Sequence, residues 1–153
     1  MNEIFLAYPS TEGHFGSTFA RWFISQGRGV CDFGSFAPAG LELRVWAPKA
    51  IGCAQECVFV GSFDAIQESS TVLFEMGLAV GAGKKVTLLL PIADRGKLGA
   101  DASADLNVCF FEMDIAVPGL LRIDDNGNTL FDESPRASRS TLINRNEAAR
   151  AYA

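Results

Sequence analysis

One carboxylate on an otherwise apolar segment is the residue of this sequence best placed to do chemistry. Glu75 lies in S-S-T-V-L-F-E-M-G-L-A-V-G, residues 69–81, where apolar residues recur as in a helix. Removing water from a carboxylate costs several kcal/mol or raises its pKa, so buried glutamates are rare unless they are paired or functional. In a partly dry crevice such a group can act as a nucleophile or stabilise an oxocarbenium-like cation.

The alternative for Glu75 is a structural carboxylate. A Gly-Lys-Lys turn, residues 83–85, follows the segment, and either lysine or an arginine could form an ion pair with it. Lysines near the C-terminus of a helix are also commonly exposed, and their charge interacts favourably with the helix dipole. A structural Glu75 would therefore either cap a backbone group or pair with one of these cations.

Five short runs of apolar residues predict β-strands, with helices between them. The runs lack polar alternation, which is typical of strands covered on both faces of a parallel sheet. The expected strands are 3–8, 28–33, 56–61, 86–90 and 106–111. Strands that alternate with helices predict an α/β fold with a doubly wound, parallel five-stranded sheet.

Apolar spacing indicates two helices before Glu75. The first lies between residues 10 and 26 and has its apolar face at Phe15, Phe19 and Phe23. The second, residues 41–53, is amphipathic, although Pro48 predicts a kink or a break in it. Its inward-facing residues are expected to be Leu41, Val45 and Ile51.

The loops that follow the strands are expected to form one site. Right-handed crossovers bring the carboxyl ends of parallel strands to one edge of the sheet, where α/β ligand sites form. A polar loop, residues 62–68, leads into the third helix, which Ser69 or Ser70 caps, so Glu75 is close to that edge. The substrate-binding side chains expected to surround the same crevice are Tyr8, Ser10, Ser62, Asp64 and Ser69.

The C-terminal part departs from the alternation of strands and helices. Asn126-Gly127, within residues 120–131, is a strong signal for a two-residue hairpin turn, and residues 141–152 could form a terminal helix. We therefore divide the chain into an α/β catalytic domain over residues 1–112 and a small hairpin and tail over residues 113–153, packed on the same domain.

Size, charge and hydropathy exclude several classes of function. The 153 residues suffice for one domain, and 48% hydrophobic with 20% charged residues indicates a globular protein. The net charge of -5 and the absence of a basic stripe argue against a nucleic-acid partner. No apolar run reaches membrane-spanning length, and the opening M-N-E-I-F-L-A-Y lacks the positive charge of a secretory signal. We therefore expect a cytoplasmic protein without a membrane partner.

The four cysteines are expected to be reduced residues of the core. Cys53 and Cys57 are the pair that is close in sequence, and a second pair and the histidines that a zinc site usually needs are missing. Cys31 and Cys109 likewise lie in apolar surroundings. No metal site is therefore predicted.

One segment resembles a known family signature. It is F-E-M-G-L-A-V-G-A-G-K-K-V-T-L-L-L-P, residues 74–91, and it is similar to the signature of the superfamily that joins nucleoside 2-deoxyribosyltransferases and nucleotide N-glycosidases with TIR-like domains. Both branches place a glutamate on a helix, followed by Gly, Ala and Gly-Lys before a buried strand. The stretches I-F-L-A-Y-P-S and A-I-G-C-A-Q-E-C-V-F-V-G-S resemble the elements before it. The likeness covers residues 3–91 and is strongest over residues 56–91.

The resemblance implies a flavodoxin-like fold and cleavage of an N-glycosidic bond between ribose or deoxyribose and a base. It makes Glu75 the catalytic glutamate, a covalent nucleophile in transferases and the support of the ribosyl cation in TIR-type NAD hydrolases. Ser69 lies where TIR domains commonly have a serine. Deoxyribosyltransferases usually have an aspartate there, within D-S-G-T, whereas this chain has E-S-S-T. Both branches therefore stay open.

These features together predict an N-ribosyl hydrolase or transferase that acts on a nucleoside, a nucleotide or NAD. No cofactor is expected, and NAD would be a substrate. A homodimer or larger homo-oligomer is expected, because dimers are common in similar proteins. The alternative is a non-catalytic TIR-like module that binds a nucleotide signal or a partner protein, in which Glu75→Gln leaves function intact.

Overall fold

The computed structural model describes residues 3–32, 43–98, 106–113, 121–125 and 128–132. These residues form a single sheet in the order β2-β1-β3-β4-β5-β6-β7. The strands are β1 (Glu3–Ala7), β2 (Gly29–Cys31), β3 (Glu56–Val60), β4 (Lys85–Pro91), β5 (Asn107–Met113), β6 (Leu121–Asp125) and β7 (Asn128–Asp132). The first five pair in parallel, and β6 and β7 pair antiparallel.

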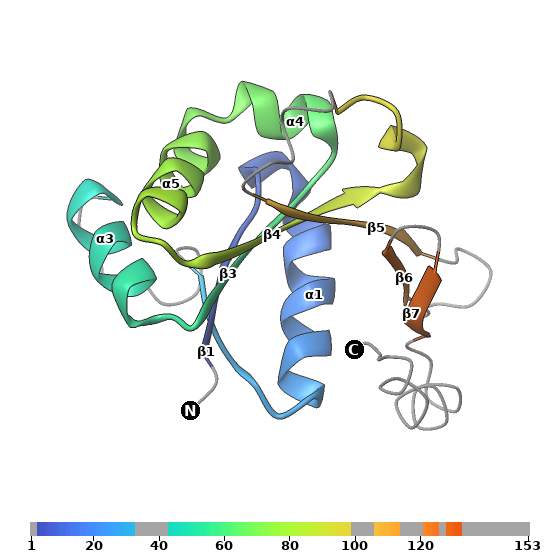
Figure 1. Ribbon diagram of the computed structural model, residues 1–153, viewed down its shortest axis with the longest axis horizontal. Coiled ribbons are helices and arrows are strands. Elements are labelled where there is room, and N and C mark those ends of the chain that lie inside the picture. The colour runs from blue at the N-terminus through green and yellow to red at the C-terminus, as the bar shows by residue number, and fades with distance from the viewer. Residues whose placement is uncertain (1–2, 33–42, 99–105, 114–120, 126–127, 133–153) are drawn as a thin grey trace.

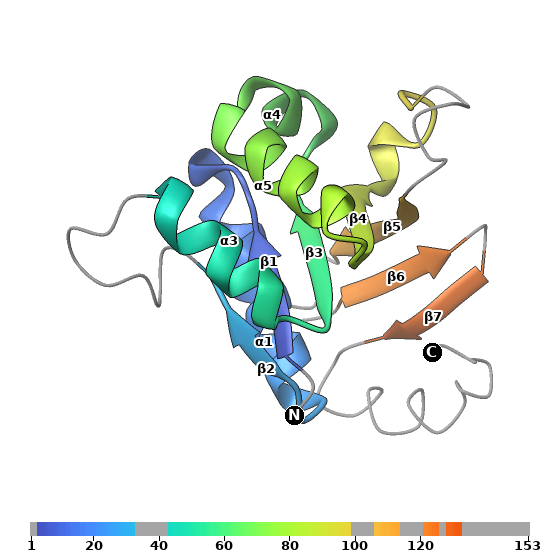
Figure 2. The ribbon, with the colours of Figure 1, turned by 60° about the vertical axis from the view of Figure 1, so that its left-hand side comes forward.

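The parallel strands confirm the predicted flavodoxin-like α/β fold. Helix α1 covers one face of the sheet, and α3 and α5 cover the other (Figures 1 and 2). Because β1 lies between β2 and β3, the order of the strands reverses at the boundary of β1 and β3. The helices are η1 (Ser10–Glu12), α1 (Gly13–Ser25), α3 (Leu43–Cys53), α4 (Phe63–Glu68), α5 (Ser70–Gly81) and η2 (Ile92–Asp94).

The central strands are apolar throughout because both of their faces are covered. Successive residues of a strand point to opposite faces, so each run contributes to two cores. Leu6 of β1 packs with Phe19 on the side of α1. Its neighbour Phe5 packs with Trp46 of α3, with the ring centroids 5.7 Å apart. Burial on both faces therefore explains why the strands could be predicted from apolar runs. The observed bounds of each strand differ from the predicted ones by one to three residues, counted over both ends.

The predicted polar loop over residues 62–68 is wrong, because residues 63–68 form helix α4. Only one side chain of this helix, Ile66, is buried. One buried residue in six gives no helical periodicity, so the sequence pattern could not indicate α4.

Helix α3 also differs from its prediction. It continues through Pro48, which was expected to kink or break it. Ile51 faces the core as predicted, but Val45 is 45% exposed, and the buried neighbours are Trp46 and Ala47. Leu41, the third residue expected to face inward, lies outside the described residues.

The C-terminal hairpin is present and extends the sheet. β6 pairs antiparallel with β5 as well as with β7, so the hairpin continues the parallel sheet at its β5 edge (Figures 1 and 2). The turn at Asn126-Gly127 and the predicted terminal helix over residues 141–152 lie outside the described residues. Among the described helices, none has the length and hydrophobicity needed to span a membrane.

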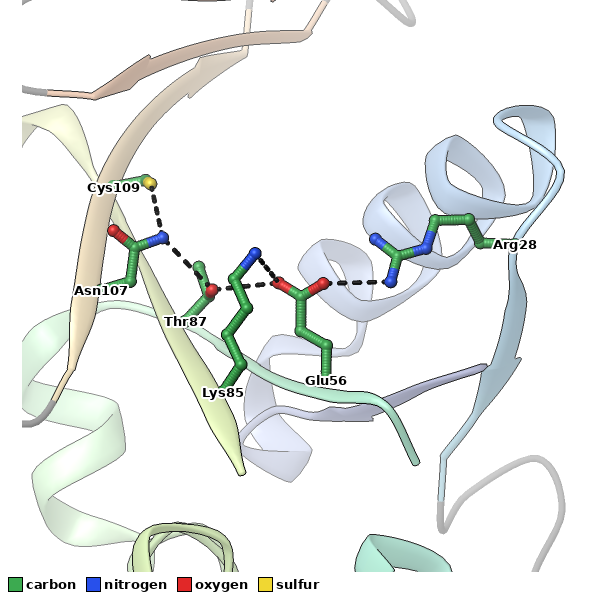
Figure 3. A network of polar contacts seen from close by, with 6 residues as sticks. All are labelled: Arg28, Glu56, Lys85, Thr87, Asn107 and Cys109. Atoms are coloured by element: carbon green, nitrogen blue, oxygen red, sulfur yellow. Dashed lines mark hydrogen bonds and ion pairs between the residues drawn. The ribbon is translucent and has the colours of Figure 1, made fainter. Parts of the chain in front are cut away.

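A chain of polar contacts, here called the amino-edge network, crosses the amino ends of the strands (Figure 3). Glu56 accepts hydrogen bonds from Nη2 of Arg28 at 3.0 Å and from Oγ1 of Thr87 at 3.1 Å. Its carboxylate also pairs with Nζ of Lys85 at 3.6 Å. Asn107 donates from Nδ2 to Oγ1 of Thr87 at 3.4 Å and extends the network to Cys109. The carboxylate at this edge is thus surrounded by donors.

Candidate functional site

Glu75 lies on the buried face of α5. The helix starts after Ser69, whose hydroxyl accepts a hydrogen bond from the amide of Val72 at 3.2 Å, which confirms the predicted N-cap. Glu75 shares the buried face with Val72 and Ala79, three residues before and four after it. It is 2% exposed, and it lies about 8 Å along the axis from the start of the helix. Helix packing therefore forces this carboxylate into the interior.

Glu75 has no hydrogen bond or ion pair to any residue in the described part of the chain. Both lysines of the following turn are engaged elsewhere. Nζ of Lys84 donates to two backbone carbonyls at the end of α3, each at 2.9 Å, and Lys85 belongs to the amino-edge network. Burial without a compensating contact raises the pKa of Glu75 to about 7. The predicted alternative of an ion pair with Lys84 or Lys85 is therefore wrong, whereas an arginine partner stays a prediction.

Tyr8 connects the carboxyl ends of β1 and β2. Its hydroxyl donates to Oδ1 of Asp32 at 3.4 Å, and Asp32, directly after β2, is 4% exposed. The ring lies over Gly16 of α1, where a Cβ atom would collide with it. Burial, the charge of Asp32 and the hydrogen bond to it all raise the pKa of Tyr8. The phenol therefore remains a hydrogen-bond donor near neutral pH.

Glu12 connects the loops that follow β1 and β3. Its carboxylate accepts hydrogen bonds from the amide of Ser62 at 2.8 Å and from the hydroxyl of Ser62 at 2.6 Å. Gly61 permits this approach, because a Cβ atom there would lie 2.8 Å from Oε1 of Glu12 and from Cδ of Pro9. These loops meet where the strand order reverses, and ligands of open α/β sheets bind at such a point.

Asp94 connects the loop after β4 to the same region. Its Oδ2 accepts a hydrogen bond from the amide of Phe63 at 2.8 Å, and Asp94 is 8% exposed. Oδ1 of Asp94 pairs with Nζ of Lys97 at 3.2 Å, and Lys97 also pairs with Asp64 at 3.5 Å. Two successive amides at the start of α4, those of Ser62 and Phe63, are therefore bound by carboxylates from two other loops.

The five residues predicted to bind substrate occupy different environments. Tyr8 and Ser62 follow neighbouring strands and both donate to carboxylates. Ser10 is exposed in η1, and the side chain of Asp64 is 73% exposed. The hydroxyl of Ser69 is used as the cap of α5. The loops of Tyr8, Ser10 and Ser62 come together through Glu12, and a role of these side chains in binding stays a prediction.

Three buried or bonded carboxylates at this edge were missed from the sequence: Glu12, Asp32 and Asp94. Each lies within five residues after a strand. Asp32 was hidden because the expected second strand ran to residue 33, one residue beyond it. Scanning the five positions after each expected strand for acidic side chains would have found Glu12 and Asp94, but not Asp32.

The cysteines agree with the prediction in part. Cys57 and Cys109 are buried and form no disulfide, and burial raises the pKa of the Cys57 thiol to about 11. Cys53 is exposed, so it is no core residue, and it ends α3 while Cys57 lies in β3. Within the described ranges, no cluster of three or more His, Cys, Asp or Glu side chains could hold a metal ion.

No protein-family model matches this sequence, and no curated protein is similar to it. Several solved structures share the fold, among them the following two. The CMP N-glycosidase BcmB of Clostridium botulinum is 17% identical, with a TM-score of 0.50, over 73% of this chain and 91% of that one. A conserved protein of Enterococcus faecalis V583 is 14% identical, with a TM-score of 0.50, over 66% of this chain and 69% of that one. At these identities the likeness shows the flavodoxin-like fold alone.

Proposed function

We propose that this protein cleaves the N-glycosidic bond of a nucleoside, a nucleotide or NAD, with Glu75 as the catalytic residue. The observation that carries the proposal is a carboxylate that is 2% exposed and has no partner among the described residues. A folded chain retains such a group against its desolvation cost when a ligand or a reaction uses it. The fold supports the proposal, since a nucleotide N-glycosidase has the same one.

The chemistry that Glu75 can perform follows from its charge. The bond between C1′ of the sugar and the nitrogen of the base breaks, and its electron pair leaves with the base. A purine or pyrimidine takes up a proton from the solvent, which the attacking water or the acceptor base later returns, whereas nicotinamide leaves as a neutral molecule without one. The positive charge that develops at C1′ is stabilised by the ionised carboxylate of Glu75, or is captured by it as an ester. Water then donates a hydroxyl group to C1′ and releases the free sugar, or an acceptor base forms the new bond instead.

The raised pKa of Glu75 implies a definite pH dependence. The group must be ionised to support a cation, and in the free protein it loses its proton at a pKa of about 7. We therefore expect kcat/KM to rise about tenfold per pH unit below pH 7 and to level off above it. A general acid would show the opposite slope, so this profile also tests the role assigned to Glu75.

The base-release assay tests the function directly. Purified protein is incubated with NAD, with deoxynucleosides and with nucleoside monophosphates, and the products are separated by chromatography. Release of free base that is lost in Glu75→Gln supports the proposal. Transfer to an added acceptor base would select the transferase reaction, and nicotinamide from NAD would select the TIR type. No free base from any of these compounds at high protein concentration would overturn it.

The second candidate is a non-catalytic module that binds a nucleotide signal. This candidate is compatible with the same fold, because one fold hosts many functions and does not by itself imply a catalytic activity. This candidate predicts that nucleotides bind equally well to the native chain and to Glu75→Gln, and that neither releases base. Calorimetric titration of both with the compounds above separates the two candidates.

A further inference from the structure

Three hydrogen-bond donors near the reversal point of the sheet are already bound within the chain. The amide and hydroxyl of Ser62 donate to Glu12, and the amide of Phe63 donates to Asp94. Oxygen atoms of carboxylates thus fill the positions at which backbone amides of a doubly wound fold would bind a phosphate. Each of the two carboxylates also adds a negative charge there.

The remaining charges of this edge do not offset these carboxylates. The described residues that connect β1 to α1, β2 to α3, β3 to α5 and β4 to β5 include five acidic side chains and two basic ones. Lys97 pairs with Asp64 and Asp94, and the guanidinium of Arg95 lies 4.6 Å from the centroid of the Phe110 ring. Residues 33–42 and 99–105 contain no lysine or arginine in the sequence. The five acidic side chains are Glu12, Asp32, Asp64, Glu68 and Asp94.

We propose that the site accepts an uncharged nucleoside and discriminates against nucleotides and NAD, with Glu12 and Asp94 as the residues that determine this specificity. The inference rests on the proposed function and narrows its substrate class. A 5′-phosphate carries nearly two negative charges at neutral pH, and at this edge it meets like charges beside two amides, those of Ser62 and Phe63, that carboxylates already bind. The hydroxyl of a nucleoside carries no charge, and the acidic side chains can accept its hydrogen bond.

Binding to a variant that cannot turn over the ligand tests the inference independently of catalysis. Glu75→Gln is titrated in a calorimeter at pH 8 with adenosine, cytidine, guanosine, uridine, their 2′-deoxy forms and the 5′-monophosphate of each. The expected result is that at least one nucleoside binds, and that its monophosphate binds more weakly by a factor on the order of ten or more. A monophosphate that binds as tightly as its nucleoside overturns the inference, and so does the absence of binding by every nucleoside.

Two charge-removing changes assign the discrimination to named residues. Glu12→Gln and Asp94→Asn, each added to Glu75→Gln, keep an acceptor oxygen for the amides of Ser62 and Phe63 while removing one charge. Each is expected to shift the ratio of the two dissociation constants about threefold to tenfold towards the monophosphate, and less at high salt. Glu3→Gln removes the same charge at the amino edge and should leave the ratio unchanged.

The outcomes for specificity and for catalysis are separate. Unchanged ratios in both variants would overturn the assignment to Glu12 and Asp94, provided that thermal unfolding shows both variants folded. Release of base from a monophosphate or from NAD more efficiently than from the nucleoside, by the native chain, would overturn the inference while supporting the proposed function. Nucleoside binding without any release of base would support the inference and contradict the proposed function.

Discussion

Carboxylates at the amino ends of the strands (the amino edge) and at their carboxyl ends (the carboxyl edge) have different hydrogen-bond partners. At the amino edge, Glu56 receives hydrogen bonds from Arg28 and Thr87 and pairs with Lys85 (Figure 3). At the carboxyl edge, Glu12 and Asp94 bind backbone amides of another loop. Glu75, on the helix that starts from that edge, has no donor among the described residues. The first two arrangements stabilise the fold, and the third costs stability.

This difference separates structural from functional carboxylates within one chain. A buried carboxylate with donors has its charged form favoured by those donors, whereas one without them has its neutral form favoured by burial. The pKa of Glu75 is raised to about 7 for this reason. Changes at the two edges should therefore affect activity and stability in opposite ways.

The largest expected effect is the loss of activity in Glu75→Gln. The amide is of similar size but can neither carry the charge nor form the ester, so kcat/KM should fall by a factor on the order of 10³ or more. Glu56→Gln, at the amino edge, is the matched control and should stay within about threefold of the native value. Steady-state rates of base release measure both. Equal losses in the two variants would remove the distinction between the edges.

The largest expected loss of stability comes from Glu56→Ala. The side chain of Glu56 is 12% exposed and that of Arg28 is 26% exposed, so the change leaves a partly buried guanidinium without its counter-charge. We expect unfolding to become easier by about 2–3 kcal/mol, measured by urea denaturation. Lys85→Ala is the control, because its side chain is 64% exposed and should contribute little. A change below about 0.5 kcal/mol in Glu56→Ala would contradict this view of the network.

Glu75→Gln should have the opposite effect on stability. Because the pKa is raised on folding, the unfolded chain loses this proton from about pH 4 upwards while the folded chain keeps it until about pH 7. The native protein is therefore destabilised as pH rises through this window, and glutamine removes the penalty. At pH 8 the variant should be more stable by roughly 1–3 kcal/mol, and at pH 4 by much less. Urea denaturation at both pH values measures this, and a variant less stable than the native chain at pH 8 would refute it.

The sequence was sufficient for the features that depend on local pattern. Unbroken apolar runs located the strands of the parallel sheet, and the serine before the third helix located its cap. Glu75 could be selected because it is the one charged residue on an otherwise apolar helix. Two-sided burial and helical periodicity both leave regular marks in a sequence.

The features that depend on distant partners could not be predicted. Glu12 is fifty residues from Ser62, and Asp94 is thirty-one residues from Phe63, so no local pattern joins them. For the same reason Ser62 was expected to bind substrate, although its hydroxyl is occupied by Glu12. Helix α4 was missed because a short helix with one buried residue is determined by its neighbours and not by its own periodicity.

The smallest effect predicted here concerns the glycine at which the carboxyl edge is assembled. In Gly61→Ala the new Cβ would lie 2.8 Å from Oε1 of Glu12 and from Cδ of Pro9, so the loops after β1 and β3 must move apart. Crowding of this kind should lower the stability by about 1–2 kcal/mol and weaken the contact between Glu12 and Ser62.

Gly77→Ala is the control: it is exposed on α5 with nothing within 4 Å of the new atom, and it should raise stability by about 0.5–1 kcal/mol. Thermal unfolding should show a lower midpoint than the native chain for Gly61→Ala and a higher one for Gly77→Ala. If Gly61→Ala is as stable as the native chain, the loops are not held by the contact between Glu12 and Ser62, and the carboxyl edge is less rigid than the amino edge.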